Sequence, residues 1–157
     1  MTKAIYPGSF DPVTYGHLDI AKRAASIFDE VIIAVMINPK KTGMFSLEER
    51  VALIEENCKD TSNIRVVSFE GLLTNYMKTQ GIKAIIKGLR TTTDYEYEFQ
   101  MALLNKRLFE QAETFLLPTS EKYSLVSSSM VKEMASFGGP ICEYVPRNVE
   151  QAIHKKI

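Results

Sequence analysis

Hydrophobic residues in this chain follow two patterns, short continuous runs and longer stretches with the spacing of an amphipathic helix. The continuous runs predict strands at residues 4–6, 31–37, 64–69, 84–87 and 114–117. Residues 31–35 are apolar without interruption, so a strand there would be apolar on both faces. Such strands are typical of a parallel sheet that is covered by helices on each side.

Between these runs, apolar residues recur at the spacing of an α-helix. Ser46 and Glu49 have the spacing of a capping box at a helix start, and Gly81 suits the left-handed residue that ends a helix. The expected helices cover residues 16–28, 46–58, 73–80, 93–110, 128–135 and 147–155. The apolar side of the long fourth helix is expected to consist of Tyr95, Phe99, Ala102 and Leu103.

Regular alternation of strands and helices predicts the fold class. It indicates a Rossmann-like, doubly wound α/β fold with five parallel strands and right-handed crossovers. The chain has 157 residues, which suits one domain over residues 1–157. In such folds ligands bind at the carboxyl ends of the strands, where the polar motifs of this chain are expected to meet.

Charge and cysteine content narrow the functional class. Nineteen basic and nineteen acidic side chains balance, which argues against general binding to nucleic acid or to an anionic membrane. The longest apolar run is too short to span a bilayer, and no signal peptide is recognised. Two widely separated cysteines predict neither a metal pair nor a disulfide framework. We expect a cytoplasmic protein.

The segment from Tyr6 to His17 carries the most specific chemistry. Its first apolar run breaks at Pro7-Gly8, Ser9 supplies a hydroxyl group, and a helix begins near His17. A strand that turns into a helix start presents unpaired N–H groups, which favour phosphate. Neither a Walker A loop nor a Gly-x-Gly-x-x-Gly fingerprint is present, which argues against P-loop kinases and ordinary dinucleotide dehydrogenases.

This segment, with Thr14-Tyr15-Gly16-His17, resembles the nucleotidyltransferase superfamily that has a Thr-x-Gly-His or His-x-Gly-His signature. Within it, the chain is similar to the bacterial phosphopantetheine adenylyltransferases over essentially its whole length. Later motifs in the same order are Lys40-Lys41, residues 88–90, 94–98 and 127–129. The resemblance implies transfer of the adenylyl group of ATP, accompanied by Mg²⁺, to 4′-phosphopantetheine, and a homohexamer built from two trimers.

The resemblance also implies roles for individual residues. His17 would stabilise the transition state. Phosphopantetheine would contact Ser9, Lys41, Leu73 and Lys87. ATP would contact Ser9, Phe10, His17, Gly88, Leu89, Arg90, Glu98, Tyr123, Ser124, Leu125, Val126, Ser127, Ser128 and Ser129. No protein side chains are assigned as direct metal ligands, because the phosphates of ATP would carry Mg²⁺.

Two charged motifs follow the fourth predicted strand. Gly88 is expected to let the chain turn after that strand, so that Lys87 and Arg90 face one crevice. The family usually has arginine at position 87, whose planar fork binds phosphate differently from lysine. In the acidic run that follows, Asp94 and Glu98 share a helix face, and most of the run is interpreted as a solvated helix start.

The proposed reaction needs no general base, because a phosphate monoester is already mostly dianionic near neutral pH. Positioning and charge neutralisation are enough to promote attack on the α-phosphate. Three alternatives remain open from the residues alone. They are a nucleotidyltransferase with another phosphate acceptor, a non-catalytic nucleotide-sensing module, and a tRNA-synthetase-like role, which the neutral charge and the lack of a tRNA-binding extension disfavour.

Overall fold

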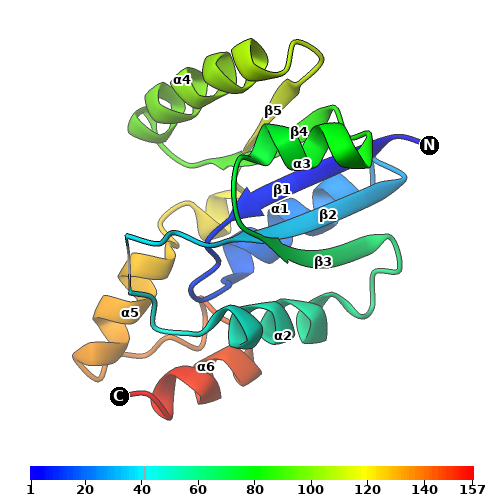
Figure 1. Cartoon of the computed structure of the whole chain (residues 1–157). Helices are drawn as coiled ribbons and strands as arrows, with labels where there is room; N and C mark the ends of the chain where they lie inside the picture. The colour runs from blue at the N-terminus through cyan, green and yellow to red at the C-terminus, as the bar shows by residue number, and fades with distance from the viewer. Residues whose placement is uncertain (41) are drawn as a thin grey trace.

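Five parallel strands form a sheet in the computed structural model, which describes residues 1–40 and 42–157. The strands lie side by side in the order β3-β2-β1-β4-β5 (Figure 1). Their bounds are β1 (Lys3–Gly8), β2 (Glu30–Met36), β3 (Ile64–Phe69), β4 (Ala84–Leu89) and β5 (Glu113–Pro118). All five predicted strands and the doubly wound α/β class are confirmed.

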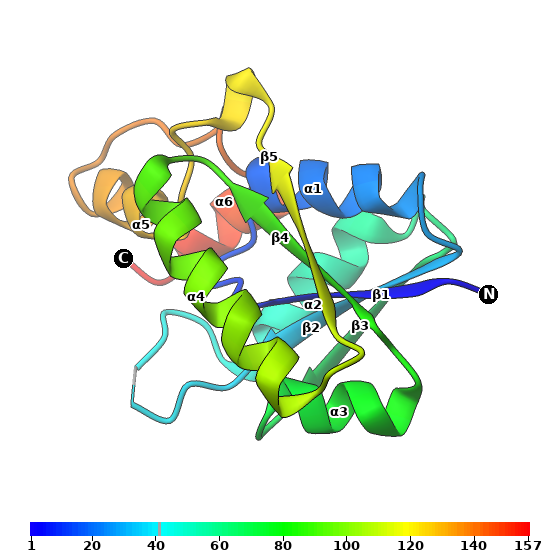
Figure 2. The ribbon, with the colours of Figure 1, turned by 90° about the horizontal axis from the view of Figure 1, so that it is seen from above.

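Six α-helices within the described residues flank the sheet. They are α1 (Tyr15–Ala25), α2 (Leu47–Cys58), α3 (Leu73–Gln80), α4 (Thr92–Leu108), α5 (Ser128–Ser136) and α6 (Arg147–His154), with a 3-10 turn η1 (Glu121–Tyr123). Figure 2 shows α1 and α3 on opposite sides of the sheet. Ile33 and Ile86 belong to the core on the α1 side, whereas Ile32 and Ile85 belong to the core beside α3. Strand residues therefore alternate between two buried layers, as their continuous apolar runs predict.

Helix boundaries follow the predicted capping signals. Ser46 and Glu49 form the expected capping box at α2, and Gly81 ends α3 with φ 66° in the left-handed region. The first helix ends earlier than predicted, at Ala25, so Phe28 lies in the following turn. Phe28 is half-buried there and packs against the α1-side core.

The apolar side expected for α4 does not pack into the core. No residue of α4 is buried, and the side chains of Phe99 and Leu103 are 46% and 58% exposed. The helix contacts β4 and the edge strand β5, and Figure 1 shows it above the rest of the sheet. Because apolar residues lie around much of its circumference, one sheet edge cannot cover them all.

The sheet reverses its direction of winding between β1 and β4, which are neighbours although two strands separate them in sequence. Their ladder pairs only Ala4 with Ala84 and Ile5 with Ile85. Beyond these pairs the two strands share no further ladder pairs, and their carboxyl ends flank the topological switch point. This is where doubly wound sheets bind ligands.

Gly88 lies inside β4 rather than in a turn after it, so that prediction was wrong. A Cβ atom at this position would lie 3.2 Å from Cγ1 of Ile20 in α1. The glycine therefore allows close packing of α1 against the strand, next to the switch point.

Candidate active site

The first cavity, of about 260 Å³, lies at the switch point between the carboxyl ends of β1 and β4. Its walls include strand residues from Tyr6 to Gly8 and from Lys87 to Gly88, and the start of α1. Polar side chains reach it from several further elements: Arg90, Asp94, Glu98, Thr119, Ser127 and Ser128. The predicted clustering of the motifs at one edge of the sheet is confirmed for these residues.

His17 is held by the first turn of its own helix. The backbone N–H of Thr14 donates to Nδ1 of His17 at 3.0 Å, and the N–H of His17 donates to Oγ1 of Thr14 at 3.3 Å. His17 thus takes the place of the glutamate in a capping box. A ring nitrogen that accepts a hydrogen bond cannot carry the proton in the neutral form, so that proton is on Nε2. Nε2–H has no protein partner among the described residues and remains available as a donor at the cavity wall.

Electrostatics favour the neutral form of this imidazole. Burial, together with the positive charges of Arg90 and Lys87, lowers the pKa of His17 to about 4 from its ordinary 6.5. At neutral pH the ring is therefore an uncharged donor rather than a cation. The ring of Phe10 packs edge-on against it, with centroids 5.0 Å apart, which fixes the ring plane from the core side.

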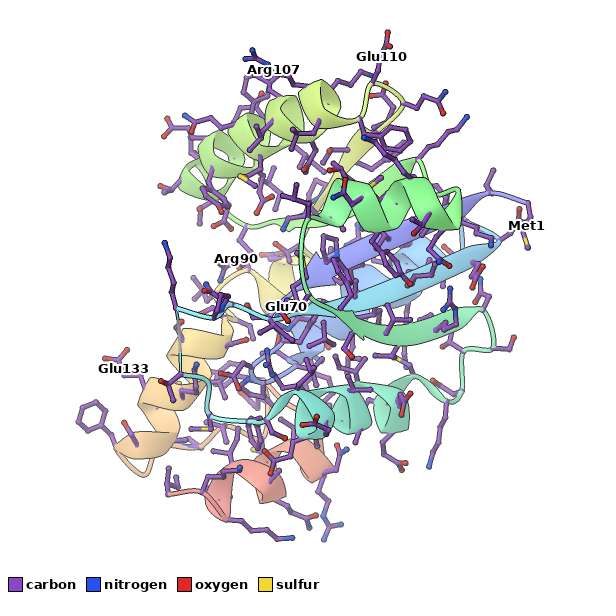
Figure 3. The ribbon with its side chains drawn as sticks, in the orientation of Figure 1. Met1, Glu70, Arg90, Arg107, Glu110 and Glu133 are labelled. Atoms are coloured by element: carbon purple, nitrogen blue, oxygen red, sulfur yellow. The ribbon has the colours of Figure 1, made fainter. Side chains whose placement is uncertain are left out.

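Arg90 joins the end of β4 to the loop before α5. Its Nε donates to Oδ2 of Asp94 at 3.0 Å, and one terminal nitrogen donates to the carbonyl of Val126 at 3.1 Å. Figure 3 shows Arg90 near the carboxyl ends of the strands, at the end of the sheet opposite Met1. Asp94 is therefore a partner of a site cation, which corrects its interpretation as part of a solvated helix start.

A second cavity, of about 410 Å³, continues from the first across the β1 turn. Its walls are mostly apolar and come from the end of β2, the start of α3 and one side of α4; they include Met36, Ile37, Leu73, Tyr97, Met101 and Leu108. The inner side of α4 therefore lines a cavity instead of joining the core. A long, partly apolar molecule fits such a channel better than a nucleotide does.

Lys87 and Glu98 stand where the two cavities meet, since both residues line each of them. Nζ of Lys87 lies 3.4 Å from Oε2 of Glu98, and their side chains are 25% and 14% exposed. Pro7 and Gly8 complete the shared wall. A group bound at this junction would contact both compartments.

The turn after β1 is anchored from below by Asp11. Its buried carboxylate accepts hydrogen bonds from the N–H groups of Met44 and Phe45, both at 2.9 Å, and lies 3.4 Å from Nζ of Lys132. Arg50 donates to the carbonyl of Ser9 at 2.8 Å. These contacts tie the turn after β1 to the segment that leads into α2.

Several residues predicted to contact ATP do not line the first cavity. Ser9 lines the second cavity and not the first. Phe10 does line the first cavity, although it is almost fully buried beneath the turn with φ 49°, and its ring packs edge-on against His17. Leu89, Tyr123, Ser124, Leu125 and Ser129 line neither cavity. Leu125 is 85% exposed.

The remaining predicted residues are placed more simply. Gly88, Arg90, Val126, Ser127 and Ser128 line the first cavity. Leu73 lines the second cavity. Lys41 lies outside the described residues.

Sequence reasoning missed Tyr6, Thr119 and the α4 wall. Burial, and then the charge of Glu98, raise the pKa of the Tyr6 hydroxyl well above its ordinary value, so it remains protonated. Tyr6 is part of an apolar strand run, which gave no sign that it would reach the cavity. Tyr97, Met101 and Leu104 line the second cavity, whereas the predicted apolar side of this helix consisted of other residues.

Among the described residues, no group of three or more histidine, cysteine, aspartate or glutamate side chains has the geometry to hold a metal ion. None of the described helices is long and apolar enough to cross a membrane. Cys58 and Cys142 are both free thiols.

Comparison with known proteins gives a consistent result. The cytidylyltransferase-like family model matches residues 5–134. The phosphopantetheine adenylyltransferase of Clostridium novyi is 54% identical over 100% of this chain and 98% of its own length. The enzymes of the same name from Caldanaerobacter subterraneus and Thermotoga neapolitana are 54% and 52% identical, over 99% and 98% of this chain and 98% and 96% of their own lengths.

A solved structure from Vibrio parahaemolyticus supports the fold. It belongs to a provisionally named nicotinate-nucleotide adenylyltransferase and has a TM-score of 0.74. The match covers 99% of this chain and 93% of that one at 20% sequence identity, which supports the fold alone. The family model and the sequence relatives, over nearly the full chain, show that this chain belongs to the phosphopantetheine adenylyltransferase family of cytidylyltransferase-like nucleotidyltransferases.

Proposed function

We propose that this protein transfers the adenylyl group of ATP to 4′-phosphopantetheine, giving dephospho-coenzyme A and pyrophosphate. The observation that carries the proposal is the junction of two unlike cavities at Gly8 and Lys87. A polar cavity with His17 suits the nucleotide, and a longer, mainly apolar cavity suits the pantetheine arm. The two phosphates that must react would then meet at the junction.

The chemistry requires little proton transfer. The acceptor phosphate attacks the α-phosphorus of ATP, a new P–O bond forms, and the bond to the β-phosphate breaks in line, so that pyrophosphate leaves. The protein has to bring two anions together and neutralise the charge that develops on the α-phosphate oxygens. Nε2–H of His17 is the donor proposed for that charge, and it is preorganised by Thr14.

Mg²⁺ is proposed to enter as part of the MgATP substrate, with its ligands supplied by phosphate oxygens and water. The side chains around the first cavity are compatible with this, because Asp94 and Glu98 are each engaged by a cation. The family resemblance further supports a homohexamer, and the uncovered face of α4 supplies apolar surface for assembly. A cytoplasmic location is proposed because both cysteines remain free.

The function is tested by measuring pyrophosphate release from ATP with a panel of phosphate acceptors: 4′-phosphopantetheine, nicotinamide mononucleotide, glycerol 3-phosphate and phosphocholine. We expect release with 4′-phosphopantetheine, matched by formation of dephospho-coenzyme A. Release with a different acceptor would assign the protein another substrate within the same fold. ATP binding without release from any acceptor would identify a nucleotide-sensing module.

A further inference from the structure

The junction between the two cavities is occupied by an ion pair that the proposed reaction has to rearrange. Among the described residues that line the second cavity, Lys87 is the only cation and Glu98 the only carboxylate. In the absence of ligands these two side chains pair at 3.4 Å. An acceptor phosphate that binds Lys87 must therefore approach a carboxylate and compete with it for the same ammonium group.

We propose that Glu98 controls acceptor binding: it restrains Lys87 while the nucleotide cavity is empty and releases it when a nucleotide is bound. This inference rests on the proposed function, because it concerns the affinities for its two substrates. Glu98 lines both cavities, so its carboxylate can accept hydrogen bonds from hydroxyl groups of a nucleotide that binds in the first cavity. A carboxylate engaged by such hydroxyls holds Lys87 less tightly.

Neighbouring charges make Glu98 the specific candidate. Arg90 is engaged by Asp94 and by the carbonyl of Val126, and it does not line the second cavity. Asp94 likewise lines only the first cavity. Asp94 and Glu98 therefore lie one turn apart on the same face of α4. Only Glu98 lines both cavities, so only Glu98 can contact both substrates.

The consequence is a coupling free energy between the two binding sites. Repulsion between the triphosphate and the acceptor phosphate opposes joint binding whatever residue occupies position 98. Release of Lys87 favours joint binding and depends on Glu98. Comparing wild type with Glu98→Gln therefore cancels the repulsion and isolates the contribution of the ion pair.

The test measures the dissociation constant of 4′-phosphopantetheine by calorimetry, with and without saturating α,β-methylene ATP, which cannot react. In Glu98→Gln without nucleotide we expect the acceptor to bind about three- to tenfold more tightly than in wild type, as expected when a partly exposed ion pair no longer competes. The ratio of the constants without and with nucleotide should be about fivefold or more larger in wild type than in the variant.

Glu96→Gln is the matched control, because it removes the same charge from the same helix at an exposed position that lines neither cavity. It should leave acceptor affinity without nucleotide unchanged, and thermal unfolding verifies that each variant is folded. Glu98→Ala provides a second variant and should give the same order of affinities. Equal coupling ratios in wild type and Glu98→Gln, or weaker acceptor binding in the variant, would overturn the proposal. Failure of wild type to bind 4′-phosphopantetheine under either condition would instead overturn the proposed function on which it rests.

Discussion

Nδ1 of His17 accepts a hydrogen bond from the backbone N–H of Thr14 at 3.0 Å. This contact determines which nitrogen of the ring carries the proton, and it therefore presents Nε2–H to the cavity. The side chain of His17 therefore both caps α1 and positions its own Nε2–H donor. The two roles can be separated by substitution.

His17→Gln retains a side chain that can accept from the Thr14 N–H, as glutamine does in a capping box, but it lacks the imidazole Nε2–H. His17→Ala removes both interactions. We expect turnover to fall about 100- to 1,000-fold in each variant, since one transition-state donor is lost. ATP affinity should change only by a small factor. Steady-state kinetics and direct ATP titration measure the two effects, and near-normal turnover in His17→Ala would refute the catalytic role.

The lowered pKa of His17 predicts a pH dependence of stability. Its folded pKa of about 4 lies below the ordinary 6.5, so between these values the unfolded chain binds more protons than the folded one. The contribution of His17 to the free energy of unfolding is therefore fully present above about pH 6.5 and declines as pH falls toward about pH 4. Denaturant unfolding of wild type and His17→Gln at several pH values should show a steeper decline for wild type. Parallel curves would show that the ring is not held neutral.

Lys87 is expected to act mainly on the acceptor. Lys87→Ala should weaken 4′-phosphopantetheine binding by about 10- to 100-fold, because a charge-assisted contact is lost. ATP binding should weaken much less. Lys87→Arg should retain activity, and its planar fork should bind the acceptor phosphate at least as tightly. Separate titrations with each substrate decide the matter, and equal losses for both in Lys87→Ala would indicate only a general electrostatic role.

Asp11 is expected to be a structural residue of the β1 turn. Asp11→Ala leaves the N–H groups of Met44 and Phe45 without their acceptor and should lower the free energy of unfolding by about 2–4 kcal/mol. Asp60→Ala removes an exposed pair with Lys22 and is a suitable control that should change stability little. Chemical denaturation compares them. A similar small effect for both variants would show that the turn does not depend on Asp11.

The uncovered face of α4 predicts self-association. Leu103 and Phe99 are large apolar residues that are exposed along this helix, and closed homo-oligomers commonly bury such surface. Light scattering should find an assembly, with six copies as the expected size, and Leu103→Glu should shift it toward smaller species. Ile27→Glu, at a similarly exposed position outside α4, is the control. A stable wild-type monomer at micromolar concentration would contradict this prediction.

Most of the fold was predictable because its signals are local. Continuous apolar runs predicted every strand, and the Ser46 capping box and Gly81 predicted helix ends. The features that the sequence did not predict depend on tertiary contacts. Gly88 is needed where Ile20 of α1 packs against β4, and nothing near Gly88 in sequence announces that contact. The spacing of apolar residues correctly predicted the α4 helix. It does not indicate whether these residues face the core, a cavity or another chain.

The sequence predicted only part of the candidate site. Motifs that follow strand ends were expected to meet, and His17, Arg90, Ser127 and Ser128 do line one cavity. Its division into two compartments was not predictable, because the Lys87–Glu98 pair depends on how α4 lies relative to β4. Tyr123, Ser124 and Leu125 were assigned to the site by resemblance alone; they line neither cavity, and their contact with ATP stays a prediction.

The two cavities are proposed to hold the two halves of one product. The most direct test is a crystal structure with dephospho-coenzyme A bound. We expect its diphosphate beside Gly8, His17 and Lys87, its adenosine in the cavity lined by Arg90 and Ser128, and its pantetheine arm in the cavity lined by Leu73 and Met101. An arm that lies outside the α4-lined cavity, or a diphosphate distant from His17 and Lys87, would contradict the account.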